Sequence, residues 1–137
     1  MFRRSRAREV ALQVLCQRDA NRAENPAFAP QFVLERLREQ PTRDYAQKLI
    51  SGVAEKSAEI DQLLTSAAEN WRLSRMASVD RNVLRLGTWE LLAKDPEVPP
   101  PVVLDEAIEL SRRFGSAESP AFVNGVLDRV RKSLEAN

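Results

Sequence analysis

The stretch SVDRNVLRLGTWELL, residues 78–92, decides the fold class of this chain. Apolar side chains recur along it at Val79, Val83 and Leu86 and continue towards Leu92, which is the spacing of one helix face. The apolar positions also extend around much of the helix circumference, as is typical of a helix in a central position. Residues 78–92 therefore predict a central helix in an all-α fold.

Helical spacing recurs in six further segments on both sides of this helix. They are residues 4–20, a short segment between Pro30 and Pro41, a segment capped by Thr42, a segment capped by Ser57, residues 103–114, and a segment that begins at Ser119–Pro120. Serine and threonine are common helix caps, and proline is favoured in a first turn. Gly115 is expected to close residues 103–114 in the left-handed conformation. The sequence thus predicts about seven helices and no convincing strand.

Three other positions are expected to have structural roles. Trp71 continues the apolar register of the helix capped by Ser57, and both Trp71 and Trp89 are expected to anchor the core or a subdomain interface. Gly125, within the last helix, is expected to permit close helix packing. A chain of 137 residues can form one compact domain or two small helical halves that share a core.

Positive charge is concentrated at the start of the chain. The whole chain has 21 basic and 20 acidic residues, yet residues 1–8 contain Arg3, Arg4, Arg6 and Arg8 and no acid. Guanidinium groups bind phosphate oxygens in bidentate fashion and stack on bases, so this helix end suits single-stranded RNA. The alternative is a solvated, frayed terminus without a partner.

The composition excludes several classes of site. The chain has no histidine, which removes Ser-His-Asp and Cys-His nucleophiles and the usual imidazole ligands of zinc. Its glycines are isolated, so no phosphate-binding loop is present. Cys16 is the single cysteine, which rules out an intrachain disulfide and fits a reducing cytoplasm. No apolar run approaches the length that spans a bilayer. We expect neither a metal nor a cofactor.

One cluster of carboxylates remains as a catalytic alternative. Asp105, Glu106 and Glu109 lie close together on one predicted helix, and such a pair could divide acid and base roles. Acids near a helix start also favour the helix dipole, and Glu109 precedes Arg112 and Arg113 by about one turn. The second interpretation is the simpler one, and we expect no enzymatic activity.

Three stretches of the chain resemble the NusB family in their order and spacing. They are RARE (residues 6–9) running into ALQVL (11–15), VDRNVLRL (79–86) followed by WELL (89–92), and DEAIELSRRFG (105–115) followed by FVNGVLD (122–128). The last string is the most specific, and together the stretches cover nearly the whole chain.

The resemblance implies a single domain, residues 1–137, of two packed helical subdomains at roughly 1–70 and 71–137. It also implies a role in transcription antitermination in the cytoplasm. The family binds the boxA RNA of ribosomal RNA leader transcripts together with NusE, a small-subunit ribosomal protein. The complex then joins the elongating RNA polymerase. Whether this chain also associates with itself is left open by the sequence.

The resemblance also assigns candidate site residues. The candidates for RNA binding are Arg3, Arg4, Arg6, Arg8, Phe122 and Asn124, and those for partner binding are Cys16, Asp80 and Glu118. Phe122 would stack on a base or close the helix start as a core aromatic, and Asn124 would read a base edge or satisfy local backbone. Cys16 stands where the family often has an aromatic residue. Asp80 and Glu118 match positions near the partner or RNA surface, or are helix-start acids.

Two function classes therefore compete. The first is an RNA-binding antitermination factor, and the alternative is a helical protein–protein interaction module without RNA binding. A small enzyme that uses Asp105, Glu106 and Glu109 is a distant third. RNA binding compared between boxA-like and scrambled sequences separates the first two.

Overall fold

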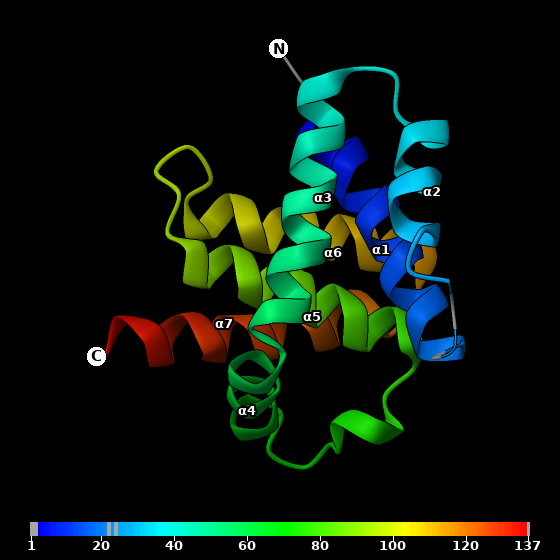
Figure 1. Cartoon of the computed structure of the whole chain (residues 1–137). Coiled ribbons are helices and arrows are strands. Elements are labelled where there is room, and N and C mark those ends of the chain that lie inside the picture. The colour runs from blue at the N-terminus through cyan, green and yellow to red at the C-terminus, as the bar shows by residue number, and fades with distance from the viewer. Residues whose placement is uncertain (1–2, 22, 24, 137) are drawn as a thin grey trace. The chain divides into compact units, whose positions relative to one another are not determined.

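A computed structural model of the protein describes residues 3–21, 23 and 25–136. Over these residues the chain forms seven α-helices and one short 3₁₀ helix, with no strand (Figure 1). The elements are α1 (Arg4–Ala20), α2 (Phe28–Arg36), α3 (Gln40–Glu55), α4 (Ser57–Ala67), η1 (Leu73–Arg75), α5 (Ser78–Ala93), α6 (Pro100–Phe114) and α7 (Ser119–Glu135). The predicted all-α fold is confirmed.

The chain divides into two compact units, Met1–Glu55 and Lys56–Asn137. The sequence placed the division near residue 70. The difference concerns α4, which contacts α5 and α7 and so belongs to the second unit. The link between α1 and α2 includes Arg22 and Glu24, which are outside the described part of the chain.

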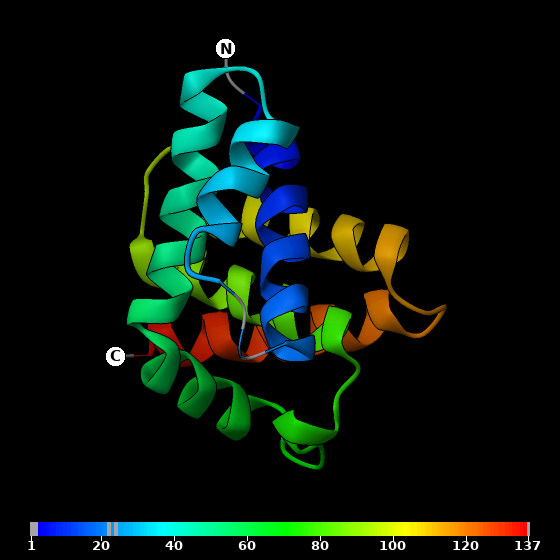
Figure 2. The ribbon, with the colours of Figure 1, turned by 45° about the vertical axis from the view of Figure 1, so that its right-hand side comes forward.

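In the first unit, α1, α2 and α3 lie side by side, as both ribbon views show (Figures 1 and 2). Val10 and Val14 of α1 and Leu49 of α3 are fully buried. The predicted cap at Thr42 is wrong, because α3 already begins at Gln40 and Pro41 occupies its first turn. Thr42 is instead buried, and its hydroxyl accepts a hydrogen bond of 3.4 Å from the backbone N–H of Arg3.

In the second unit, α5 contacts α4, α6 and α7, as its apolar circumference predicted. Val83, Leu84 and Leu86 are buried. Gly87 allows α7 to approach, since a Cβ atom there would lie 2.7 Å from Cδ1 of Leu127. Within the described residues, none of the helices combines the length and apolar character needed to cross a membrane.

Two glycines have roles that differ from those predicted. Gly115 is not left-handed but extended, with φ −100° and ψ −162°. A side chain is excluded for another reason: a Cβ atom there would lie 2.5 Å from Oγ of Ser119 and 2.8 Å from the carbonyl oxygen of Ser111. Gly125 does not serve close packing, because a Cβ atom there would meet only Nη1 of Arg129, at 3.9 Å.

The predicted serine caps also need correction. Helix α4 begins at Ser57 and α7 at Ser119, and the preceding residues Lys56 and Glu118 form no side-chain cap. Ser119 still stabilises the helix start, because its hydroxyl accepts a hydrogen bond of 3.0 Å from the backbone N–H of Ser116. That bond joins the α6–α7 turn to the first residue of α7.

Candidate functional site

The basic cluster of Arg3, Arg4, Arg6 and Arg8 begins α1, and its members differ in exposure. Arg3 is exposed, Arg4 and Arg6 are partly exposed, and Arg8 retains only 2% of its accessible surface. Successive residues of a helix point in different directions, so a run of arginines cannot all face solvent when one side of α1 packs on α3.

Tyr45 of α3 explains where two of these guanidinium groups lie. The Cζ atoms of Arg4 and Arg8 are 5.4 Å and 5.8 Å from the centroid of the Tyr45 ring, within the range of cation–π attraction. Arg8 is therefore part of the packing between α1 and α3. The assignment of Arg8 to RNA binding stays a prediction, and the burial of its side chain makes it the least accessible of the four arginines.

Arg6 keeps a surface position. Its side chain is 34% exposed, and its Nη1 atom forms an ion pair of 3.5 Å with Glu9 one turn later. An ion pair of this kind is weak and exchanges readily for a phosphate contact. Arg3 and Arg6 are thus the members of the cluster best placed to meet an anion. Cys16 lies partly exposed towards the other end of α1.

In the second unit, three predicted site residues meet at one hollow of about 270 Å³, which we call the aromatic pocket. Phe122, Asp80 and Glu118 line it together with Trp71, Arg75, Met76 and Ala77. The sequence had assigned Phe122 to RNA and the two acids to a protein partner. Their shared location makes them parts of one surface.

The prediction that Trp71 anchors the core or a subdomain interface is wrong, because its side chain is exposed at the aromatic pocket. Trp71 lies beyond the end of α4 and is 59% exposed, whereas Trp89 is buried as predicted. Its ring meets the ring of Phe122 edge-on, with centroids 5.8 Å apart and planes at 73°. The helical register does not reach Trp71 because Glu69 adopts a positive φ of 45°. Asn70, a common helix-ending residue, was the available signal in the sequence.

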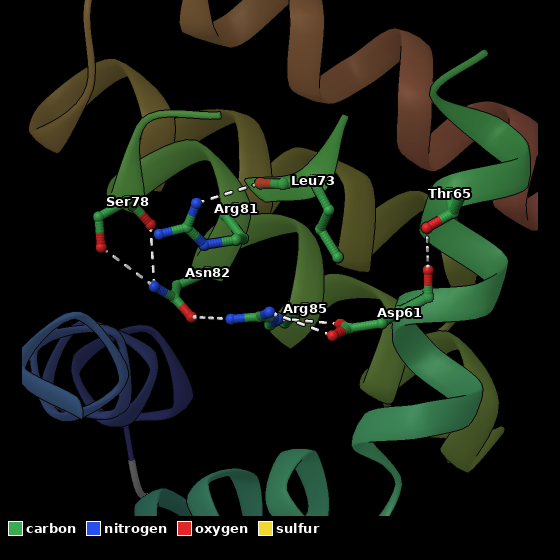
Figure 3. A network of polar contacts seen from close by, with 7 residues as sticks. All are labelled: Asp61, Thr65, Leu73, Ser78, Arg81, Asn82 and Arg85. Carbon is green, nitrogen blue, oxygen red and sulfur yellow. Dashed lines mark hydrogen bonds and ion pairs between the residues drawn. The ribbon is translucent and has the colours of Figure 1, made fainter. Parts of the chain in front are cut away.

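Arg81 fixes the segment that carries one wall of the aromatic pocket. Its Nη1 atom donates hydrogen bonds to the carbonyl oxygens of Leu73, at 3.1 Å, and Met76, at 2.9 Å. Both acceptors belong to the turn around η1, and Figure 3 shows the Arg81 side chain reaching from α5 towards Leu73. The carbonyl groups of this short turn are thereby satisfied from the neighbouring helix.

A second set of contacts, made by Arg85 and Asn82 of α5, joins α5 to α4. Arg85 binds both carboxylate oxygens of Asp61, at 3.0 Å and 3.1 Å, a bidentate geometry that favours a fixed orientation (Figure 3). Asn82 is buried, accepts a hydrogen bond from Arg85 and donates to the carbonyl oxygen of Ser78 at 2.9 Å. These contacts fix α4 against α5 within the second unit.

Asn124 does not share the surface of Phe122. It is exposed on α7 and lines a separate hollow with Asp105, Asp128 and Arg131. There, hydrogen bonds from Arg131 and Lys132 hold the pKa of Asp128 below its ordinary value. Three acids, Asp105, Asp128 and Glu135, line this hollow against one base, Arg131, so it offers less to a phosphate than the basic cluster does.

The carboxylate cluster of α6 has the geometry of a surface ion-paired helix. Glu109 accepts a hydrogen bond of 2.7 Å from Nη1 of Arg112, and both side chains are more than half exposed. No group of three or more Cys, Asp or Glu side chains in the described residues is arranged to hold a metal ion. Helix α6 begins at Pro100 and has no acid in its first turn, so the expected helix-dipole role of these acids is wrong, whereas the ion pair between Glu109 and Arg112 is confirmed.

Comparison with known proteins identifies close relatives. The NusB family model matches residues 5–132. A transcription antitermination protein NusB from Sorangium cellulosum (strain So ce56) is 51% identical over 134 residues, which cover 98% of this chain and 95% of the relative.

Solved structures of the same family are also similar to this chain. The structure of T. maritima NusB has 39% sequence identity and a TM-score of 0.84, and the match covers 96% of this chain and 92% of the other. The structure of antitermination factors NusB and NusE in complex with dsRNA matches at 31% identity and a TM-score of 0.84, over 95% of this chain and 96% of the other.

Proposed function

This chain belongs to the NusB family of transcription antitermination proteins, and from that premise we propose that it binds boxA RNA of ribosomal RNA leader transcripts together with NusE. The bound complex would join the elongating RNA polymerase in the cytoplasm. The protein would act by binding, without a catalytic step or a cofactor.

The observation that carries this proposal is the similarity to the NusB–NusE–dsRNA complex, because it extends over almost the whole of both chains. A relative that holds RNA and NusE at once supports the same two partners here. Self-association remains a further option, which a molar-mass measurement in solution would test.

The geometry of the basic cluster supports a phosphate-binding role for two of its arginines. Arg3 and Arg6 reach solvent at the start of α1, where Arg6 forms an ion pair of 3.5 Å with Glu9. We propose that these two guanidinium groups bind the RNA backbone. Arg4, which lies over Tyr45, would contribute mainly through its field.

The aromatic pocket supports a second contact region in the other unit. Phe122 is partly exposed at this pocket and is proposed to stack on RNA. Asp80 and Glu118 line the same pocket, and they remain candidates for the protein partner, as does Cys16 on α1. Asn124 is a weaker candidate for RNA because it lies on a different face of α7.

Filter binding tests the proposal against the alternative of a module that binds only proteins. The full chain should retain a boxA-like single-stranded RNA more strongly than a scrambled RNA of the same composition, and more strongly again with NusE present. Retention of neither RNA under either condition would favour the protein-only module.

A further inference from the structure

We propose that Trp71, together with Phe122, forms a stacking site for one unpaired nucleobase, with Arg72 and Arg75 holding the adjoining phosphates. This inference rests on the proposed function and specifies a binding site within it. The RNA-binding residues assigned above include neither Trp71 nor the two arginines of the η1 segment.

The exposure of Trp71 is the first argument. The chain contains two tryptophans, and Trp89 is 9% exposed in the core while Trp71 is 59% exposed on the surface. An indole ring is a large apolar group that gains stability from burial, so its retention in solvent points to a ligand that covers it. Tryptophan also provides a broad π-face that accepts any base.

The geometry of the ring pair leaves room for that ligand. Trp71 and Phe122 meet edge-on, at 73° and 5.8 Å between centroids. In an edge-on pair, one ring has both faces free of its partner and the other has one face free. A base can therefore stack on a free face of either ring, and the other ring then contacts the edge of the base. Stacked and edge-on contacts are the arrangements that aromatic groups prefer.

The size of the aromatic pocket fits one flat group. Its volume of about 270 Å³ is below the roughly 300 to 1,000 Å³ of sites that enclose drug-sized molecules. Its lining has two acids, Asp80 and Glu118, against one base, Arg75, and this net negative charge disfavours a phosphate inside. The base rather than the backbone is therefore placed in the pocket.

Asp80 supplies an unused hydrogen-bond acceptor beside the rings. Its Oδ1 atom is buried and has no hydrogen-bond partner among the residues that the structure describes. A buried acceptor without a donor is unfavourable and is satisfied when a ligand supplies one. The exocyclic amino groups of adenine, cytosine and guanine are such donors, as is the ring N3–H of uracil.

The charge of the η1 segment suits the adjoining phosphates. Residues 71–75 are WRLSR, with two arginines and no acid. Arg72 and Arg75 are exposed, and neither forms an ion pair within the described part of the chain. Several other exposed or half-exposed arginines are paired, for example Arg112 with Glu109. Alternating aromatic and unpaired arginine side chains are typical of surfaces that bind single-stranded nucleic acid.

Tryptophan fluorescence tests the stacking directly, because the exposed and buried rings can be separated. In a Trp89→Phe protein, Trp71 is the only emitter, and its emission should be quenched as a boxA-like single-stranded RNA is added. In a Trp71→Phe protein, the emission of Trp89 should stay unchanged. Trp71 emission that does not respond to saturating RNA would overturn the inference.

Affinity gives the second readout. Trp71→Ala should weaken RNA binding about 5- to 150-fold, the range for loss of one stacked base. The matched control is Leu34→Ala, which removes a 61% exposed apolar side chain in the other unit and should leave the affinity unchanged.

The outcomes separate this inference from the proposed function. If the parent protein binds no RNA, with or without NusE, the proposed function fails and the stacking site with it. If the parent binds and Trp71→Ala binds equally well, only the stacking site is wrong. Loss of NusE binding without loss of RNA binding in Trp71→Ala would assign this surface to a protein and would also overturn it.

Discussion

Arg6 and Arg8 are two residues apart on α1, yet their substitution should affect different properties. Arg6→Ala removes a partly exposed guanidinium, so it should make the slope of log affinity against log salt shallower by about 0.7 for one phosphate on single-stranded RNA. Its ion pair with Glu9 is worth about 0 to 1 kcal/mol, and arginine at a helix start opposes the dipole. The melting temperature should therefore change little.

Arg8→Ala should do the reverse. Its guanidinium is buried and lies 5.8 Å from the centroid of Tyr45. A desolvated cation–π contact is worth about 2 kcal/mol, and at about 3 to 5 °C per kcal/mol the melting temperature should fall by about 6 to 10 °C. The salt slope of the folded variant should equal that of the parent.

Two assays on the same preparations test this pair. Thermal unfolding followed by circular dichroism gives the stability, and fluorescence anisotropy of labelled RNA at several salt concentrations gives the slope. If Arg3 and Arg6 each bind one phosphate, their joint contribution is a slope of about −1.4, and a four-fold rise in salt costs about seven-fold in affinity. An Arg8→Ala protein with normal stability and a shallower slope would refute the reasoning from burial.

Three further predictions follow from the second unit. Gly115→Ala should destabilise the protein by about 1 to 3 kcal/mol through overpacking, whereas Gly125→Ala, where space is open, should stabilise it by about 0.5 to 1 kcal/mol; denaturant titration measures both. Arg81→Ala should release the turn around η1, so hydrogen exchange of residues 72–77 should accelerate while that of α7 stays slow; equal protection in the variant and parent would contradict this role. Asp128→Asn should make the stability of the protein less sensitive to acid. In the parent, the lowered pKa of Asp128 stabilises the folded state above about pH 4, and this stabilisation is lost as the pH falls through the lowered value. Melting temperatures between about pH 2 and 6 test this.

The positions of the helices could be predicted from the sequence, because apolar periodicity indicates directly which face of a helix is buried. The pattern Val79, Val83, Leu86 predicts a central position for α5, and α5 contacts α4, α6 and α7 in its unit. Helix caps were harder to predict from the sequence. Proline in the first turn of α3 moved its start ahead of Thr42, and a cap assigned by residue type alone does not anticipate such a shift.

The candidate site was predictable in composition but not in exposure. Sequence identified the basic cluster, yet the depth of Arg8 depends on Tyr45, which lies far away in the chain and packs under it. The exposure of Trp71 was not predicted, because the apolar pattern alone continues the helical register to it. In the structure, the left-handed residue Glu69 interrupts that register. Long-range packing sets the burial of Arg8, and local backbone conformation sets the exposure of Trp71. Apolar periodicity predicts neither.

We expect this protein and NusE to bind RNA as one cooperative assembly. Isothermal titration calorimetry of boxA-like RNA into the full chain, with and without saturating NusE, measures that cooperativity. NusE should tighten RNA binding by about 5- to 150-fold, the usual range of a coupling free energy, and RNA should tighten NusE binding by the same factor. An RNA affinity that NusE leaves unchanged would contradict it.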